Sequence, residues 1–136
     1  ELKEIYELRE VLEIFAINKF LANFDPVKLK KLEKITKLMG GLHKIIDETT
    51  REHESMVLDY EFHIELCNLS GNSYNANYHR LLLLHNNMAC IHKKSYLGLK
   101  KQYFKSHKII VEKLKEGSDE ATTMLQQHFQ NVWKFL

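Results

Sequence analysis

The chain has 136 residues, 44% of them hydrophobic and 28% charged, which is the length of one domain with a single buried core. One proline and five glycines are too few for a loop-rich β-sandwich or a low-complexity sequence, so an all-α fold is expected. The net charge of +2 and the scarcity of arginine argue against a surface that reads DNA bases.

Hydropathy and cysteine placement bear on the compartment. The longest aliphatic run, residues 81–84, is far shorter than the ~18 residues of a membrane span. Cys67 and Cys90 lie inside apolar helical patterns without a CxxC motif, which is typical of reduced core residues. A soluble, cytoplasmic protein with no membrane partner is therefore expected.

Glycines and capping residues divide the chain into helical segments. Asp25 followed by Pro26 is one well-defined helix start, and Gly117 marks a helix end. Because the connections are short, neighbouring helices should pack antiparallel in a bundle of six or seven. The expected helices cover residues 2–23, 27–39, 52–69, 73–96, 100–116 and 119–135, with a short seventh helix over 42–48 as an alternative.

Titratable side chains stand on the apolar stripes of three expected helices. Asp59 and His63 share one face at i, i+4 in the third helix, and His107 and His128 take inward positions in the fifth and sixth. Buried groups of this kind need partners because their desolvation is costly. One oxygen and three nitrogens suit a divalent transition metal, with Zn as first choice and Ni, Mn or Fe(II) as others. The spacing therefore predicts a buried metal site.

The remaining histidines divide into two groups. His85 and His92 are seven residues apart and share a stripe with Tyr78 and Leu81. They are expected to line a ligand pocket, or else to fill core space while bonded to each other or to carbonyls. Three others fit no such pattern and are expected at the surface or its boundary: His43, His53 and His79.

Arg9 lies among acidic residues in the first helix, with Glu13 one turn further on. One interpretation is a surface ion pair with Glu13 at i, i+4. The other is that Arg9 turns inward and binds an anionic ligand as a bidentate fork. The residues by themselves favour the ion pair.

Several segments resemble one known family. Residues 59–63 (DYEFH) resemble the D-x-x-F-H motif of the FCD domain, the C-terminal effector domain of FadR-type GntR-family transcriptional regulators. Residues 7–13 (ELREVLE) resemble its opening E-x-R-x-x-L-E helix, and residues 69–72 its S-G-N turn. His107 and then His128 follow in the order of the family's later histidines, so the resemblance spans nearly the whole chain.

The resemblance implies a divalent metal on one Asp and three His inside an antiparallel all-α bundle. Carried over to this sequence, that set is Asp59, His63, His107 and His128, the same four that spacing selects. It also implies a homodimer and a small carboxylate or sugar-acid effector beside the metal. Candidate effector ligands are Arg9 and, in the fourth helix where relatives are often arginine-rich, His85, Asn86 and His92.

These features predict an effector-sensing domain of a bacterial regulator that binds its ligand without turnover, so no catalytic residue is expected. DNA binding is expected only through an N-terminal winged helix-turn-helix of a parent protein, because nothing in residues 1–136 resembles that domain. One alternative is a metal-dependent enzyme, but the chain has no Glu-x-x-His pair and no second inward carboxylate is expected beside Asp59. The other is a plain helical interaction domain whose inward histidines bond one another.

Overall fold

The computed structural model describes residues 2–90 and 100–133, with side chains for residues 2–83 and 104–133. Helices and turns make up this part of the chain, which confirms the all-α fold. The α-helices are α1 (Leu2–Ala22), α2 (Lys30–Gly40), α3 (Glu48–Asn68), α4 (Ser73–Cys90), α5 (Lys100–Lys115) and α6 (Glu120–Trp133). Two short 3-10 helices, η1 (Pro26–Leu29) and η2 (Leu42–Lys44), flank α2.

Capping residues explain where the helices begin. Asp25 accepts a hydrogen bond from the Val27 amide at 3.1 Å, with Pro26 in the first position of η1, as predicted. Helix α3 begins four residues earlier than expected, because the Asp47 side chain accepts a hydrogen bond from the Thr50 amide at 2.9 Å. The expected short helix over 42–48 is only the 3-10 turn η2, and residues 91–96 of the expected fourth helix lie outside the described residues.

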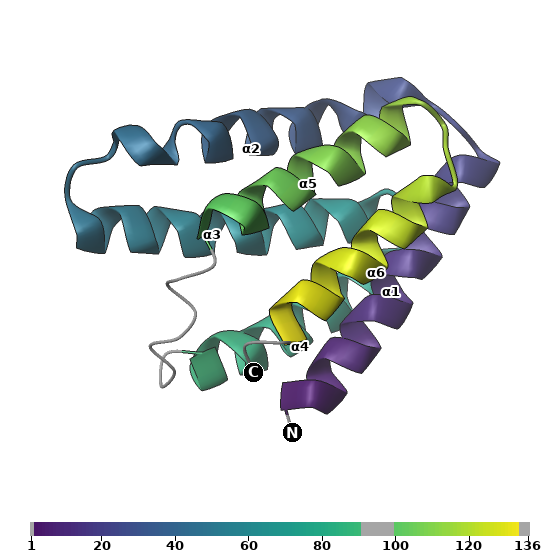
Figure 1. Ribbon diagram of the computed structural model, residues 1–136. Coiled ribbons are helices and arrows are strands. Elements are labelled where there is room, and N and C mark those ends of the chain that lie inside the picture. Colours follow the sequence, from purple (N-terminus) through teal and green to yellow (C-terminus); the bar gives the residue numbers. More distant parts are fainter. Residues whose placement is uncertain (1, 91–99, 134–136) are drawn as a thin grey trace.

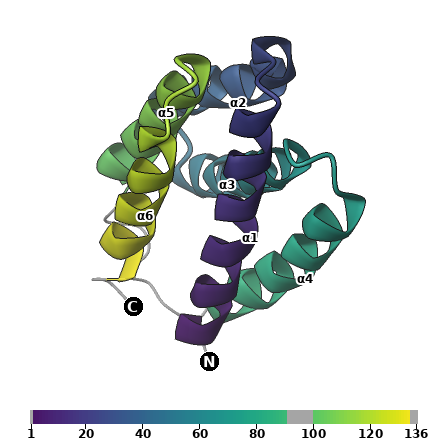
Figure 2. The ribbon, with the colours of Figure 1, turned by 90° about the vertical axis from the view of Figure 1, so that its right-hand side faces the viewer.

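The helices form a bundle in which α3 has the central place. Helices α2, α3 and α5 lie roughly alongside one another, and α1 and α6 lie side by side across them (Figure 1). The turned view in Figure 2 shows α4 on the side of α1 that faces away from α6. Helix α3 contacts α1, α2 and α4, and α5 packs on α2 and α6. Side chains from α3, α5 and α6 can therefore meet inside the bundle.

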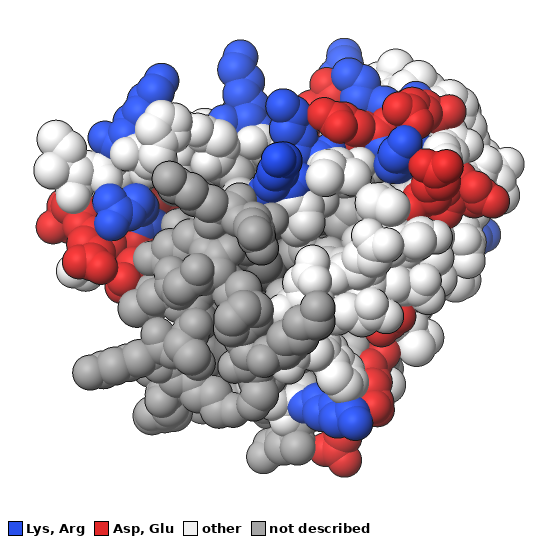
Figure 3. Space-filling model, in the orientation of Figure 1, with Lys and Arg blue, Asp and Glu red and all other residues white. Residues whose placement is uncertain are grey.

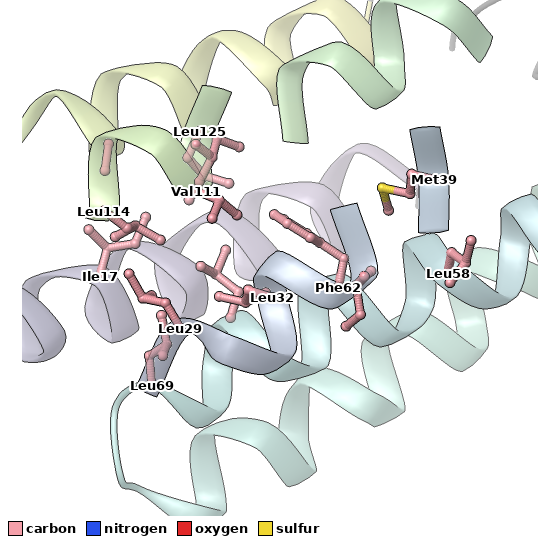
Figure 4. Packing of buried hydrophobic residues seen from close by; sticks show 14 of the residues in the cluster. Ile17, Leu29, Leu32, Met39, Leu58, Phe62, Leu69, Val111, Leu114 and Leu125 are labelled. Carbon is pink, nitrogen blue, oxygen red and sulfur yellow. The ribbon is translucent and has the colours of Figure 1, made fainter. Parts of the chain in front are cut away.

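A hydrophobic cluster joins five of the six helices. Buried side chains from α1, α2, α3, α5 and α6 pack together around residues such as Phe62, Leu114 and Leu125 (Figure 4). Two aromatic members of this cluster, Phe62 and Phe129, also contact histidine rings, at centroid distances of 4.5 Å to His107 and 5.7 Å to His128. The apolar core thus forms part of the wall around the buried histidines.

Charged side chains gather at one edge of the bundle (Figure 3). Lysine and arginine side chains gather along the upper edge of the face in Figure 3, over α2 and α5. Cys67 is buried and carries a free thiol, as predicted, whereas the side chain of Cys90 lies outside the described part of the chain. None of the described helices has the length and hydropathy that a membrane crossing requires.

Candidate metal centre and its buried polar network

The four residues predicted as metal ligands lie on three helices and face one another. Helix α3 carries Asp59 and His63 one turn apart, α5 carries His107, and α6 carries His128. Asp59 is only 7% exposed, and the three histidines are between 0% and 1% exposed. Residues that are up to 69 positions apart in the sequence are thus gathered in one water-poor region of the bundle.

The distances within this group fit a metal centre. Asp59 Oδ1 lies 3.0 Å from His107 Nε2 and 3.3 Å from His63 Nε2. Each of His63, His107 and His128 offers one ring nitrogen within 4.8 Å of the others. Metal bonds of about 2.0–2.2 Å place neighbouring ligand atoms roughly 3 Å apart, which the two Asp59 distances match.

An unsatisfied nitrogen also fits this interpretation. His63 Nε2 is buried and makes no hydrogen bond within the part of the chain that the structure describes, although it points toward Asp59. Buried polar atoms without a partner are uncommon in folded proteins, and an absent ion is one explanation. Three imidazoles and one carboxylate are a donor set that Zn, Ni, Mn or Fe(II) accepts.

The pKa shifts follow from burial and from the close approach of opposite charges. Burial alone would raise the pKa of Asp59, but His63 and His107 outweigh it and hold that pKa well below the usual value. Burial, with His107 and His63 adding to it, lowers the pKa of His128 well below its usual value. An ionised carboxylate and a neutral imidazole are the forms that bind metal, so both shifts favour coordination.

The surroundings of the group hold its rings in place. Ser106 Oγ forms a hydrogen bond with His128 Nδ1 at 2.6 Å. The ring of Phe62 packs edge-on against His107, and the His107 and His128 rings meet at 4.4 Å. Neighbours that fix the orientation of ligating rings are usual around metals in proteins.

A second buried carboxylate, which was not expected from the sequence, adjoins this group. Glu13 of α1 is fully buried, and its Oε1 atom is in close contact with His63 Nδ1. Its other oxygen, Oε2, lies 2.9 Å from His79 Nε2 and 3.8 Å from Arg9 Nε. Burial would raise the pKa of Glu13, but His63 and His79 outweigh this effect and lower it far below its usual value. Glu13 is therefore an anion held among three nitrogen-bearing side chains.

Arg9 pairs with Glu13 as predicted, but not at the surface. Its side chain is fully buried, and its guanidinium carbon lies 4.7 Å from the centre of the Tyr6 ring and 5.3 Å from that of Phe129. The surface ion pair is thus corrected to a buried one, and the inward orientation of Arg9 is the observed one.

His79 was expected at the surface or its boundary, and this expectation was wrong. It is fully buried, because its imidazole supplies a partner for the buried Glu13 carboxylate. The stripe assigned to this helix was wrong as well: Tyr78 is 60% and Leu81 57% exposed. Helix α4 turns a more polar face inward, where Asn75 Nδ2 donates a hydrogen bond to the Leu12 carbonyl at 3.1 Å.

The other histidine predictions have separate outcomes. His43 and His53 are exposed, as predicted. His85 and Asn86 belong to α4, but their side chains lie outside the described part of the chain. His92 lies outside the described residues altogether. The effector-binding roles of these last three residues stay predictions.

A signal for Glu13 was present in the sequence. Five of the six buried positions of α1 follow one another at spacings of three, four, three and four residues, and two of them are charged: Tyr6, Arg9, Glu13, Ala16 and Phe20. A continuous helical stripe of this kind includes its charged members in the buried face. For His79 the corresponding signal was its position between Ala76 and Leu83, which are both buried.

Comparison with known proteins assigns the chain to a family. The family model described as FCD domain matches residues 4–131, which is nearly the whole chain. Searches of curated proteins and of solved structures each gave no significant match. FCD domains are the effector-binding domains of GntR-type regulators. The chain therefore belongs to the FCD domain family.

Proposed function

We propose that this FCD domain senses a small carboxylate or sugar acid through a divalent transition metal, and that it binds this effector without turnover. The metal ligands are Asp59, His63, His107 and His128, and Zn is the first choice of metal ahead of Ni, Mn or Fe(II). The observation that carries the proposal is the convergence of three buried imidazoles and one buried carboxylate from three helices. A metal bound there would supply Lewis-acid positions for a carboxylate oxygen.

Arg9 supports the anionic character of the effector. Its buried guanidinium borders Phe129, whose ring centre is also 6.0 Å from that of His63. The Arg9 guanidinium and the His63 ring thus both lie next to the Phe129 ring. A guanidinium binds carboxylates in a bidentate manner, so Arg9 is well placed to select an anion that reaches the metal.

The arrangement of Glu13 favours binding over catalysis. A metal-dependent hydrolase needs a general base beside the metal, and no second inward carboxylate was expected from the sequence. Glu13 corrects that expectation, yet both of its oxygens are engaged, one by His63 and the other by His79. A carboxylate held in this way suits positioning rather than proton transfer to a substrate.

We further propose that residues 1–136 form a single ligand-binding and dimerisation domain of a cytoplasmic bacterial regulator. DNA binding would come from a winged helix-turn-helix in the parent protein. Two exposed apolar rows, one on α1 and one on the neighbouring α4, support a homodimer: Leu8, Val11 and Phe15, and Tyr74, Tyr78 and Leu81. Apolar rows of this kind are common where two copies of a chain meet.

Thermal unfolding with candidate effectors tests the proposal. Lactate and gluconate serve as probes of the small carboxylates and sugar acids, added separately to Zn²⁺-loaded protein and to protein stripped with chelator. The proposal expects at least one probe to raise Tm in the loaded protein and neither to do so in the stripped protein. Equal shifts in both preparations would contradict the role of the metal. A protein that takes up no metal, so that its inward histidines only form hydrogen bonds with one another, would instead favour a plain helical interaction domain.

A further inference from the structure

Glu13 of α1 touches a predicted metal ligand through a charged group. Its Oε1 atom contacts His63 Nδ1, and its side chain is fully buried. A charge placed there must be compensated, because burying an unpaired carboxylate is costly. The contact with His63 therefore helps to compensate the buried charge of Glu13.

The two nitrogens of His63 face different groups. Nδ1 faces Glu13, whereas Nε2 faces Asp59. A carboxylate only accepts hydrogen bonds, so His63 must carry a proton on Nδ1 to bond Glu13. In the neutral ring that a metal requires, this tautomer leaves the Nε2 lone pair on the side of Asp59, another residue of the proposed ligand set.

The Glu13 carboxylate is itself held from its far side. His79 Nε2 lies 2.9 Å from Oε2, and the His79 and His63 rings are stacked with planes only 10° apart. Arg9 Nε approaches the same oxygen at 3.8 Å. Glu13 therefore has little freedom to rotate away from His63.

We infer that Glu13 is a positioning residue of the metal site, which sets the tautomer and the orientation of His63 so that Nε2 can bind the metal. The inference rests on the proposed function, because it requires the metal site to exist. It adds a residue that supports the coordinating set without belonging to it. His79 and Arg9 hold the Glu13 carboxylate in place, and Glu13 in turn holds His63. The same carboxylate then joins the metal site to the cation proposed to bind the effector.

Metal affinity provides the first test. Zn²⁺ is titrated against a chromophoric chelator in competition with wild-type protein, Glu13→Gln and Glu7→Gln. Glu7 is exposed on the same helix, so its variant controls for the loss of one negative charge. Removing a carboxylate behind a metal-bound histidine weakens binding by about 10- to 100-fold. We expect a loss of that size in Glu13→Gln and an unchanged affinity in Glu7→Gln.

The outcomes separate this inference from the proposed function. A wild-type protein that binds no Zn²⁺ overturns both. A wild-type protein that binds Zn²⁺, together with a folded Glu13→Gln variant of equal affinity, overturns the role of Glu13 alone. Circular dichroism of each variant establishes whether it is folded.

The tautomer of His63 gives a test that needs no change to Glu13. In Zn²⁺-loaded wild-type protein, long-range ¹H–¹⁵N correlation spectra distinguish a proton on Nδ1 from one on Nε2. The His63 signals are assigned by their absence in His63→Gln. The inference expects His63 to be protonated at Nδ1 and metal-bound at Nε2, a signature that a merely structural ion pair does not require. Metal on Nδ1 would overturn it, whatever the stability of the Glu13 variant.

Discussion

His107 Nε2 lies 3.0 Å from Asp59 Oδ1, although the two residues are 48 positions apart in the sequence. The contact ties α5 to α3 in the interior of the bundle. His63 Nε2 approaches the same oxygen from within α3. This shared oxygen is the geometric basis for the proposed metal site, and it makes His107 the first residue to test.

The variant His107→Ala should bind metal weakly and lose the stabilisation that metal gives. A metal present at about 1,000 times its Kd stabilises a native state by ~4 kcal/mol. For a chain of this length that corresponds to a Tm change on the order of 10 °C. Differential scanning fluorimetry with and without Zn²⁺ measures it, and His53→Ala is the control because His53 is exposed. A full Zn²⁺-dependent shift in His107→Ala would remove that residue from the site.

Arg9→Lys should weaken carboxylate binding while the protein still takes up metal. The lysine keeps the positive charge beside Glu13 but loses the forked geometry of the guanidinium. A hydrogen bond to a charged group contributes about 1.5–3 kcal/mol, so a loss of roughly 10- to 100-fold in affinity is expected. Isothermal titration of Zn²⁺-loaded protein with the carboxylate that raises Tm measures this loss. Undiminished affinity would place the anion site elsewhere.

The metal-free protein should lose stability as the pH falls below about 6.5, the usual pKa of histidine. Burial lowers the pKa of His128 in the folded state, so the unfolded chain binds the proton first. Stability from this group is complete above pH 6.5 and declines below it, by at most ~1.4 kcal/mol per pH unit. His63 acts in the opposite sense near pH 6.5, because its raised pKa lets the folded state bind that proton first. This opposing effect fades at lower pH, where His63 of the unfolded chain is protonated as well.

Denaturant unfolding between pH 7 and pH 5 measures the slope in chelator-treated protein. The variant His128→Gln should show a shallower slope than wild type, whereas His43→Gln should match wild type because His43 is exposed. Equal slopes in all three proteins would mean that His128 is not held neutral in the fold.

Gly117→Ala should destabilise the bundle by about 1–2 kcal/mol, because Gly117 has a φ of +66° that residues with a Cβ avoid. An added Cβ would also meet the Phe24 ring at 3.4 Å. Gly40→Ala is the matched control, since Gly40 ends α2 with open space around it and a helical alanine is favourable. Urea unfolding of both variants checks the difference. A Gly117→Ala variant as stable as Gly40→Ala would contradict the turn geometry.

The helices and the inward placement of the four candidate metal ligands could be predicted from the sequence, because both depend on helical periodicity. Asp59 and His63 are one turn apart in any helix that covers residues 59–63, and the apolar stripe around them fixes which way they face. Gly117 ended a helix for a similarly local reason, since only its backbone conformation matters.

Helical periodicity could mark Glu13 and His79 as members of buried stripes, but it could not identify the buried partner of either residue. Each is buried because the other is, at a distance of 66 residues, and hydrophobicity alone assigns such polar residues to the surface. Helix α4 buries a polar face that includes His79, so the apolar stripe expected to face inward points outward, and Tyr78 and Leu81 are exposed. Pairing between distant polar residues depends on tertiary structure, which periodicity along one helix does not contain.

The metal content of the purified protein tests the central proposal most directly. Tag-free protein, purified without chelator, is compared with the Asp59→Ala/His63→Ala double variant by inductively coupled plasma mass spectrometry. The double variant His43→Ala/His53→Ala, which changes two exposed histidines, serves as control. We predict about one transition-metal ion per chain in wild type and control, and almost none in the Asp59 and His63 variant. Wild-type protein that holds no metal, even after incubation with Zn²⁺ or Ni²⁺, would contradict the metal-dependent sensor.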